Sequence, residues 1–232
     1  MVSCCQCKQE RVSIETQMIH VDNSTDSIAD QAYMDYLAPT KAFMDSEMGI
    51  ILGYAPDSMK VDTFECTMLN WAADALLDAA QEVCPKHVDF ALINRGGARC
   101  SWVPGNITLG DVFDMMPFDN RMVVVTLNGE QVLELFTKLA KGNAQGIAGM
   151  RVKFVKKQLA EITIGGKPVD PKAIYRIATN SYLAKGKDGM TALKYDKHPW
   201  DSGLRIRDIY VEAVRKQGTL RPTIDGRMVI EK

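Results

Sequence analysis

Two hydrophobic periodicities alternate along the chain, and together they predict its secondary structure. Apolar residues that recur at three- and four-residue steps predict helices over residues 28–48, 65–83, 108–116, 128–139 and 204–216. Short apolar or alternating runs predict strands over residues 50–54, 88–93, 122–127, 150–155, 159–164, 175–178 and 227–230. Several strands follow one another without an intervening helix. We therefore predict an α+β fold, with mixed sheets and flanking helices, rather than a doubly wound parallel sheet.

Local signals mark where several of these helices begin and end. Asp62 and Thr63 are expected to cap the helix over 65–83, and Asn128, with a glutamine three residues later, is expected to cap the helix over 128–139. Gly142 is expected just after that helix ends. Pro39 lies inside the first helical pattern. We expect it to end or kink that helix, because proline lacks the amide hydrogen that a helix interior requires.

The pattern divides the chain into a short leader, one helix and a main body. Its 232 residues are enough for one large domain or two small ones. Residues 1–24 are polar and show no sustained period, which predicts a flexible leader. We interpret residues 25–48 as a linker or docking helix outside the main body, and residues 49–232 as a single domain.

The charge balance excludes some classes of partner. Lys and Arg total 28 against 29 Asp and Glu, so the formal net charge is −1. A surface that binds nucleic acid or an anionic membrane requires an excess of basic residues, and we therefore expect no DNA or RNA partner. The chain also lacks a run of about 18 apolar residues, the length that a membrane-spanning helix requires.

Three of the six cysteines, Cys4, Cys5 and Cys7, lie close to the N-terminus. The segment Met1–Cys4 is similar to the end of a bacterial lipoprotein signal, in which a small residue precedes the cysteine that becomes lipidated. The basic and apolar portions of such a signal are not seen, so a lipid anchor through Cys4 and an ordinary flexible leader are both open interpretations. The wide spacing of the other cysteines excludes a disulfide scaffold and lacks the pairing typical of zinc sites.

Three loop segments carry the candidate chemistry. Asn94–Arg99 follows a predicted strand and combines an amide, two glycines and a guanidinium, which suits a phosphate or a carboxylate. A tight turn with a surface arginine is an equally open interpretation of it. Met116–Asn120 places an aromatic ring where a loop begins, although most single aromatic residues belong to the core. Thr179–Gly189 has a tyrosine after a strand, followed by glycines and an aspartate.

Taken together, these segments resemble the C-terminal, substrate-recognising domain of the 5′-nucleotidases, a family that includes periplasmic UDP-sugar hydrolases. The family motif Asn-x-Gly-Gly-x-Arg corresponds to Asn94–Arg99, Ile-Thr-x-x-Asp-Val/Leu to Ile107–Val112, and Pro-Phe-x-Asn to Pro117–Asn120. An Asn-Phe/Tyr-Leu-Ala loop that leads into Gly-Gly-Asp-Gly corresponds to Asn180–Gly189. The resemblance runs from about residue 48 to the C-terminus, and it implies the mixed α+β fold of that domain.

The resemblance also implies a clamp for a nucleotide. Phe118 and Tyr182 would hold the base between their ring faces, and Asn120 would contact the edge of the base. Asp188 would accept hydrogen bonds from the ribose hydroxyls or the base. Gly142 would belong to a glycine-containing loop that closes over the nucleoside.

The phosphate side of this clamp departs from the family pattern. Arg99 and Asn94 would hold the phosphate or the ribose, as the motif implies. The family has further arginines where this chain has Asp62 and Phe64, and a carboxylate at such a position weakens phosphate binding. Lys187 replaces the second glycine of Gly-Gly-Asp-Gly and returns some positive charge.

In the family, a separate N-terminal domain hydrolyses the ester with two metal ions held by Asp, Asn and several His. This chain has only His20, His87 and His198, in unrelated segments, and none of the metal-binding motifs. We therefore expect no catalytic residue, metal or other cofactor in this chain, and divalent metals on a partner metallophosphatase chain to which it presents a nucleotide. The alternative is a non-catalytic surface lipoprotein that keeps the fold without nucleotide binding. Both hypotheses imply an extracytoplasmic location, periplasmic or membrane-anchored.

Overall fold

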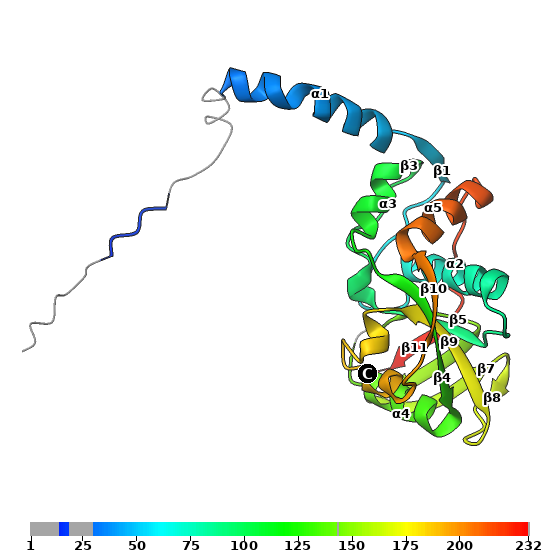
Figure 1. Cartoon of the computed structure of the whole chain (residues 1–232). Helices are drawn as coiled ribbons and strands as arrows, with labels where there is room; N and C mark the ends of the chain where they lie inside the picture. Colours follow the sequence, from blue (N-terminus) through cyan, green and yellow to red (C-terminus); the bar gives the residue numbers. More distant parts are fainter. Residues whose placement is uncertain (1–13, 19–29, 143, 232) are drawn as a thin grey trace, which may run out of the picture. The chain divides into compact units, whose positions relative to one another are not determined.

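The computed structural model describes residues 14–18, 30–142 and 144–231 of the chain. Its elements are shown in Figure 1 and fall into two units, Met1–Phe43 and Met44–Lys232. Most of the predicted leader, including Cys4, Cys5 and Cys7, lies outside the described residues. All three candidate loops belong to the second unit, which is therefore the part of the chain that bears on function.

Helix α1, Gln31–Met48, has no buried residue, and its exposed side chains include Tyr33, Tyr36 and Phe43. The helix continues through Pro39, so of the two outcomes expected there an end of the helix is wrong, and a kink stays a prediction. Proline removes the amide donor of one helical hydrogen bond, but α1 is exposed along its length. Water can therefore hydrogen-bond to the carbonyl that loses its partner.

A five-stranded mixed sheet forms the centre of the second unit. The strand order is β10-β4-β9-β2-β5, and the same strands are labelled in Figure 1. β2 and β9 run parallel, whereas the other neighbouring pairs are antiparallel. The strands are β2 (Phe90–Ile93), β4 (Arg121–Asn128), β5 (Gly146–Ala148), β9 (Ile174–Asn180) and β10 (Trp200–Arg205). This mixture of strand directions agrees with the predicted α+β class.

Alternate residues of the central sheet belong to two hydrophobic cores, one on each face. Val124 and Ala178 belong to a core shared with three helices, α2 (Thr67–Val83), α3 (Leu109–Met115) and α5 (Ile206–Gln217). Their neighbours Val123 and Ile177 belong to a core shared with helix α4 (Gly129–Leu139) and a second sheet. Successive side chains of a strand point to opposite faces, so the valine run of β4 is buried on both.

Two smaller sheets complete the second unit. One has four strands in the order β11-β6-β7-β8, and the other pairs β1 with β3. Their strands are β1 (Ile51–Ala55), β3 (Gly105–Thr108), β6 (Met150–Val155), β7 (Gln158–Ile164), β8 (Lys167–Pro168) and β11 (Met228–Glu231). The sequence analysis missed β3, β5, β8 and β10. The first three are short and β10 is largely exposed, so they lack the sustained apolar pattern on which strand prediction depends.

Helices α3 and α4 both begin with a capping box. Thr108 and Asp111 each accept a hydrogen bond from the backbone N–H of the other at the start of α3, and Asn128 and Gln131 do the same at the start of α4. The Asn128 cap was predicted and is confirmed. Gly142 lies in the turn after α4 and donates its backbone N–H to the carbonyl of the last helical residue at 3.0 Å.

Helix α2 begins differently from its prediction. Its N-cap residue is Cys66, which makes no capping hydrogen bond through its side chain, so the prediction that Asp62 and Thr63 cap this helix is wrong. The Asp62 carboxylate accepts instead from the N–H and hydroxyl of Thr63. Glu65 lies before the helix and accepts from the backbone N–H of Asp225 at 3.0 Å. The same Glu65 oxygen accepts from Asn70 Nδ2 of α2 at 2.9 Å, so Glu65 links the start of the helix to a segment 160 residues away.

Two further features concern the part of the chain that the structure describes. No helix within it is both long enough and apolar enough to cross a membrane. The cysteines within it, Cys66, Cys84 and Cys100, are free thiols. Cys66 is buried, whereas the other two are partly exposed.

Candidate functional site

The three candidate loops lie at the same end of the strands of the five-stranded sheet, which is called the sheet edge below. β2 and β9 are parallel, with Ala91 opposite Ala178, so the loops that follow both strands leave at the same end. β4 is antiparallel to β9, with Met122 opposite Asn180, so the loop that precedes β4 lies at this end too. Segments that are distant in sequence are therefore brought together by strand pairing alone.

Two buried asparagines join the loops that follow β2 and β9. Asn180 Nδ2 donates to Asn94 Oδ1 at 3.1 Å, and Asn180 Oδ1 accepts from the backbone N–H of Leu183 at 2.8 Å. Asn94 Nδ2 donates to Asp188 Oδ2 at 2.7 Å. The exposed fractions of Asn94 and Asn180 are 7% and 3%. Asn94, a predicted ligand contact, thus has both polar atoms bonded to neighbouring side chains and fixes the position of Asp188.

Asp188 is held in a left-handed backbone conformation between two glycines. Its φ is 52°, and those of Gly186 and Gly189 are 73° and 77°. Besides Asn94, the Asp188 carboxylate accepts from the Tyr182 hydroxyl at 2.9 Å. This hydrogen bond and desolvation raise the pKa of Tyr182, because both favour the neutral phenol. The carboxylate remains exposed, and it has lone pairs left to accept from hydroxyl groups of a ligand.

Two aromatic side chains at this edge are partly exposed. Phe118 is 37% and Tyr182 39% exposed, whereas Phe90 and Phe136 are completely buried in the core. The guanidinium of Arg99 lies over the Phe118 ring, 5.4 Å from its centre, in a cation–π arrangement. Both rings are therefore accessible to a ligand. That they hold a base between them stays a prediction.

The loop before β4 is anchored to helix α5. Arg207 donates to Asp119 Oδ1 at 2.7 Å, and its guanidinium lies 4.2 Å from the centre of the Phe113 ring. The carbonyl of Asn120 accepts from the backbone N–H of Ile206 at 2.9 Å. Sequence analysis missed Arg207, because a charged residue on an amphipathic helix is usually solvated, whereas this side chain is only 9% exposed. These contacts position the segment that carries the exposed phenylalanine ring.

A polar cavity of about 350 Å³ lies beside the loop after β2. Its lining residues are Val61, Arg95, Gly96, Ala98, Arg99, Cys100 and Ser101. Arg95, which was not a predicted site residue, donates through Nε to the carbonyl of Asp62 at 2.7 Å. Its backbone N–H donates to Gln145 Oε1 at 2.9 Å. The cavity is thus lined by two arginines of one loop and by Val61, which precedes Asp62, where the chain departs from the family pattern.

Gly142 lies at the start of the loop that leads into β5, and it is exposed. β5 pairs with β2, with Gly146 opposite Ile93, so this loop reaches the same sheet edge. The backbone N–H of Ala144 donates to the carbonyl of Thr63 at 2.9 Å. The loop therefore borders the candidate site, and its closure over a nucleoside stays a prediction.

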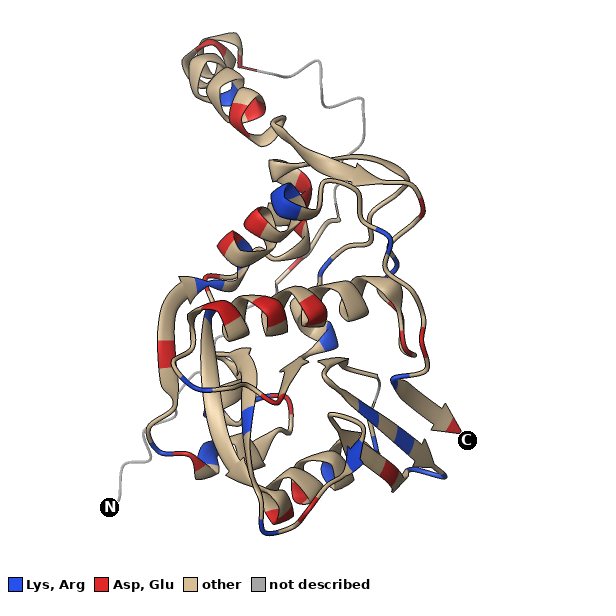
Figure 2. Ribbon diagram, turned by 90° about the vertical axis from the view of Figure 1, so that its right-hand side faces the viewer, with Lys and Arg blue, Asp and Glu red and all other residues tan. Residues whose placement is uncertain are grey.

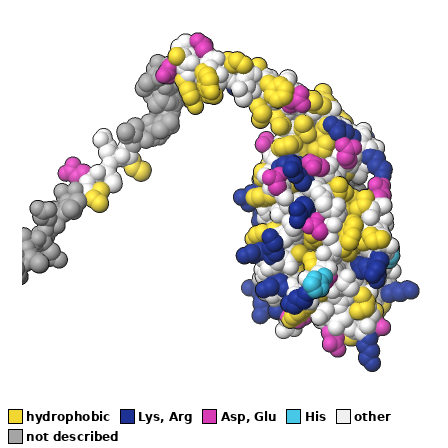
Figure 3. Space-filling view, in the orientation of Figure 1, with side chains coloured by type: hydrophobic (Ala, Val, Ile, Leu, Met, Phe, Trp, Pro, Cys, Tyr) yellow, Lys and Arg dark blue, Asp and Glu magenta, His cyan; other side chains and the backbone are white. Residues whose placement is uncertain are grey.

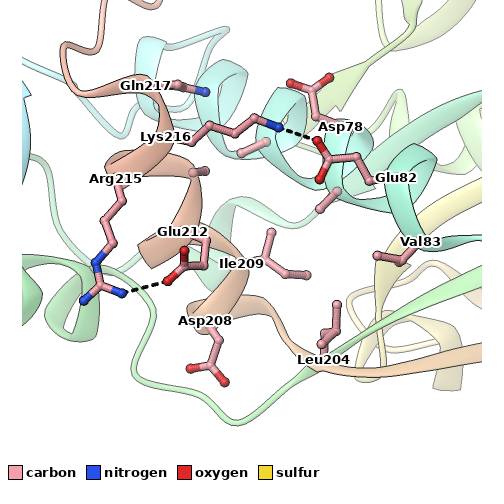
Figure 4. Close-up of a pocket in the computed structure, with 13 residues that line it drawn as sticks. Asp78, Glu82, Val83, Leu204, Asp208, Ile209, Glu212, Arg215, Lys216 and Gln217 are labelled. Carbon is pink, nitrogen blue, oxygen red and sulfur yellow. Dashed lines mark hydrogen bonds and ion pairs between the residues drawn. The ribbon is translucent and has the colours of Figure 1, made fainter.

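A larger cavity, of about 710 Å³, lies between α2 and α5 (Figure 4). Its lining includes the apolar side chains of Ala79, Val83 and Ile209, and acidic residues recur along α2 in Figure 2. Lys216 pairs with Glu82 and Arg215 with Glu212 (Figure 4). The lining also contains four carboxylates, those of Asp78, Glu82, Asp208 and Glu212. Four carboxylates against two cations would repel a phosphate, so the smaller cavity at the sheet edge suits an anionic ligand better.

Side chains able to bind a metal are scattered over the second unit. Within the described residues, no group of three or more His, Cys, Asp or Glu side chains could hold a metal ion. His87 and His198 are exposed and lie in separate segments, and His20 lies outside the described residues. Figure 3 shows basic and acidic side chains interspersed over the face of the second unit that it presents. Opposite charges therefore lie side by side on that face.

Comparison with protein families identifies the family to which this domain belongs. The model of the 5′-nucleotidase C-terminal domain matches residues 49–195, more than half of the chain. The chain belongs to this family. The resemblance inferred from the loop motifs is thereby confirmed, and so is the mixed α+β fold that it implied.

Individual relatives support the same assignment. The trifunctional nucleotide phosphoesterase protein YfkN of Bacillus subtilis is 30% identical over 185 residues, which cover 72% of this chain and 12% of that protein. A probable 5′-nucleotidase of Treponema pallidum is 28% identical over 182 residues, which cover 69% of this chain and 31% of that protein. The structure of a 5′-nucleotidase precursor from Thermus thermophilus matches with a TM-score of 0.77 and 23% identity, over 89% of this chain and 43% of that one. The chain thus spans less than half the length of these relatives.

Proposed function

We propose that this 5′-nucleotidase C-terminal domain binds a nucleotide, or a similar phosphorylated nucleoside, at the edge where β2, β4 and β9 present their loops, and that it acts in nucleotide catabolism. One observation carries the proposal. Two accessible rings, Phe118 and Tyr182, lie on loops at the same sheet edge as the Asp188 carboxylate and the Arg99 guanidinium. An apolar surface for a base, an acceptor for hydroxyls and a cation for phosphate are the three groups that recognition of a nucleotide requires.

The aromatic rings would supply much of the affinity. Stacking of a base on an aromatic side chain contributes about 1–3 kcal/mol in proteins that bind single-stranded nucleic acid. The Arg99 guanidinium already lies over Phe118, so it would lie close to a ligand stacked on that ring. Asn94 would act by positioning Asp188, to which it donates a hydrogen bond.

Hydrolysis of the bound nucleotide would depend on a metallophosphatase on a separate chain, which would carry the divalent metals. The much greater length of the relatives, of which this chain covers 12% and 31%, is consistent with a further domain in those proteins. Helix α1, whose residues are all at least partly exposed, is the segment that we expect to dock on that partner. We also place the protein outside the cytoplasm, since the Thermus thermophilus relative is described as a precursor. The lipid anchor through Cys4 remains a hypothesis.

A second candidate function is a surface lipoprotein that keeps the fold without binding nucleotides. Asp62 favours it, because a carboxylate stands where the family pattern has an arginine. Hydrogen bonds from Thr63 lower the pKa of Asp62, so this carboxylate keeps its negative charge at neutral pH. Charge repulsion would then oppose the binding of a phosphate.

Isothermal titration calorimetry of the full chain with adenosine, AMP, UMP and UDP-glucose separates the two candidates. We expect at least one nucleotide to bind, and Phe118→Ala and Tyr182→Ala each to weaken binding by about tenfold or more. Tyr54→Ala is the matched control, because this tyrosine is 46% exposed on β1. Absence of binding by all four compounds would favour the lipoprotein, whereas unchanged binding by Phe118→Ala would contradict stacking of the base on this ring. Phosphate release with Mn²⁺, Co²⁺ or Zn²⁺ tests the division of labour, and turnover by this chain alone would contradict it.

A further inference from the structure

The cavity beside the loop after β2 is lined by hydrogen-bond donors rather than by carboxylates. Among its seven lining residues are two arginines and a serine, and none is an aspartate or glutamate. Ser101 Oγ accepts from the backbone N–H of Val61 at 2.9 Å. Its hydroxyl hydrogen is therefore left to donate elsewhere. A cavity of this composition suits an anion with several acceptor oxygens.

The two guanidinium groups are held in place and keep donors in reserve. Arg95 uses Nε to bond the Asp62 carbonyl, and within the described residues no acceptor is bonded to its two terminal nitrogens. Arg99 bonds the carbonyl of Gly96 through one terminal nitrogen at 3.3 Å. An anchored guanidinium with a free fork of donors is pre-organised for bidentate binding of a phosphate or a carboxylate.

The backbone around Arg95 is also fixed. The residue begins a short 3-10 turn, Arg95–Gly97, and its N–H donates to Gln145 Oε1 at 2.9 Å. The backbone N–H of Arg99 donates to the carbonyl of Met115 at 2.9 Å. The loop is therefore tied on one side to the segment before β5 and on the other to α3, which limits the entropy lost when a ligand binds.

Of the nearby acidic groups, Asp62 interacts electrostatically with Arg95, and none lines the cavity. Asp62 does not line the cavity, and its carboxylate is exposed and bonded to Thr63. Burial, together with the charges of Asp114 and Asp111 on α3, raises the pKa of the Cys100 thiol. Cys100 is therefore neutral at pH 7 and adds no negative charge. The cavity lining thus contains two arginines and no carboxylate.

We propose that Arg95 determines specificity: with Arg99 and Ser101 it binds the phosphate group, so that the site prefers nucleotides to the corresponding nucleosides. This inference rests on the proposed nucleotide binding. Arg99 links the two parts of the site, since it lines the cavity and also lies over Phe118. Arg95 stands at an unspecified position of the Asn-x-Gly-Gly-x-Arg motif, so the motif itself does not require a cation there.

Calorimetry with AMP and adenosine on the full chain tests the proposal, with Arg95→Gln, Arg95→Lys and the control Arg221→Gln. Arg221 is at least partly exposed and lies outside the cavity lining. We expect AMP to bind at least about tenfold more tightly than adenosine, the ratio that one charge-assisted hydrogen bond provides. Arg95→Gln is expected to reduce AMP affinity about ten- to a hundredfold and to change adenosine affinity less than about twofold. Arg95→Lys, which keeps the charge but not the fork, is expected to recover part of the AMP affinity.

The outcomes distinguish this inference from the proposed function. If adenosine and AMP bind with equal affinity, or if Arg95→Gln leaves AMP affinity unchanged, the inference is wrong and nucleotide binding stands. If Arg95→Gln weakens adenosine and AMP equally, Arg95 supports the loop rather than the phosphate, and the inference is again wrong. If neither compound nor any other nucleotide binds, the proposed function fails and this inference fails with it. Urea unfolding of each variant shows whether the loss is local.

Discussion

The hydrogen bond between the two buried asparagines leads to a sharp prediction. In Asn94→Ala, the Asn180 Nδ2 group loses its acceptor, which lies at 3.1 Å, while Asn180 Oδ1 stays bonded to Leu183. Asn180 is only 3% exposed, so the orphaned donor stays out of bulk water. An unsatisfied buried polar group costs about 1–3 kcal/mol. The Asp188 carboxylate also loses a donor, but it is exposed and water can replace it. We expect Asn94→Ala to lower the free energy of unfolding by about 2 kcal/mol.

A double-mutant cycle separates the bond from the rest of each side chain. Asn94→Ala, Asn180→Ala and the double variant are unfolded in urea and followed by tryptophan fluorescence. Because Asn180→Ala also removes the donor that would be orphaned, the double variant is expected to lose about 1 kcal/mol less than the sum of the single losses. Asn106→Ala is the matched control, since this asparagine is exposed on β3, and its change is expected to stay within about 0.5 kcal/mol.

Two results would refute this reasoning. A loss below about 0.5 kcal/mol for Asn94→Ala would mean that the donor of Asn180 is not desolvated. Strict additivity in the double variant would mean that the two amides do not interact in solution. Either result would also mean that Asn180 does not hold the Asn94 amide that donates to Asp188.

Further predictions concern the remaining loops. Gly129→Ala at the start of α4 would normally raise helix propensity, but a Cβ there would lie 1.9 Å from a backbone carbonyl oxygen. We therefore expect the free energy of unfolding, measured in urea, to fall by about 1–3 kcal/mol. Asp119→Asn removes the negative charge that pairs with the buried Arg207 side chain. Since Asp119 is 73% exposed, we expect the free energy of unfolding to fall by only about 1 kcal/mol, and nucleotide binding, measured by calorimetry, to weaken. Asp188→Asn is expected to lower the raised pKa of Tyr182 towards about 10, as measured by absorbance at 295 nm against Tyr182→Phe. Because the pKa of Tyr182 is raised in the folded protein, this hydrogen bond contributes its full stabilisation below a pH of about 10. The stabilisation is lost as the pH rises through the raised pKa of Tyr182. Unchanged stability of Gly129→Ala or Asp119→Asn, or an unchanged phenol titration, would contradict the respective contacts.

Those features of the fold that depend on neighbours in sequence could be predicted. Each capping box joins side chains three residues apart, as with Asn128 and Gln131, so the start of α4 is visible in the sequence. The start of α2 was predicted wrongly: Cys66 is its N-cap residue, the Asp62 carboxylate bonds Thr63, and Glu65 bonds the distant Asp225 as well as Asn70. Pro39 was expected to end or kink a helix that in fact continues, since an exposed helix tolerates the loss of one donor. Local rules fail where a distant segment or water supplies the missing partner.

The candidate site shows the same limit. The loop motifs identified the segments that β2, β4 and β9 bring to one edge, and strand pairing explains why they meet. The sequence could not show that Asn94 bonds Asn180 rather than standing free for a ligand. Nor could it show that Arg207 reaches from α5 to Asp119. The two interactions join residues 86 and 88 positions apart, and neither residue type has a local signal for such a bond.

The departures at positions 62 and 64 must therefore be interpreted together with Arg95. Taken alone, Asp62 in place of an arginine argues for a weakened anion site. In the folded domain, the carbonyl of Asp62 is the acceptor that holds Arg95 at the cavity, 33 residues away in sequence. The same segment that lacks a cation thus anchors one that comes from another loop, and Gln145 fixes that loop from a third. The charge at this edge depends on which side chains the fold brings together, so the identity of a single position does not decide whether the site accepts a phosphate.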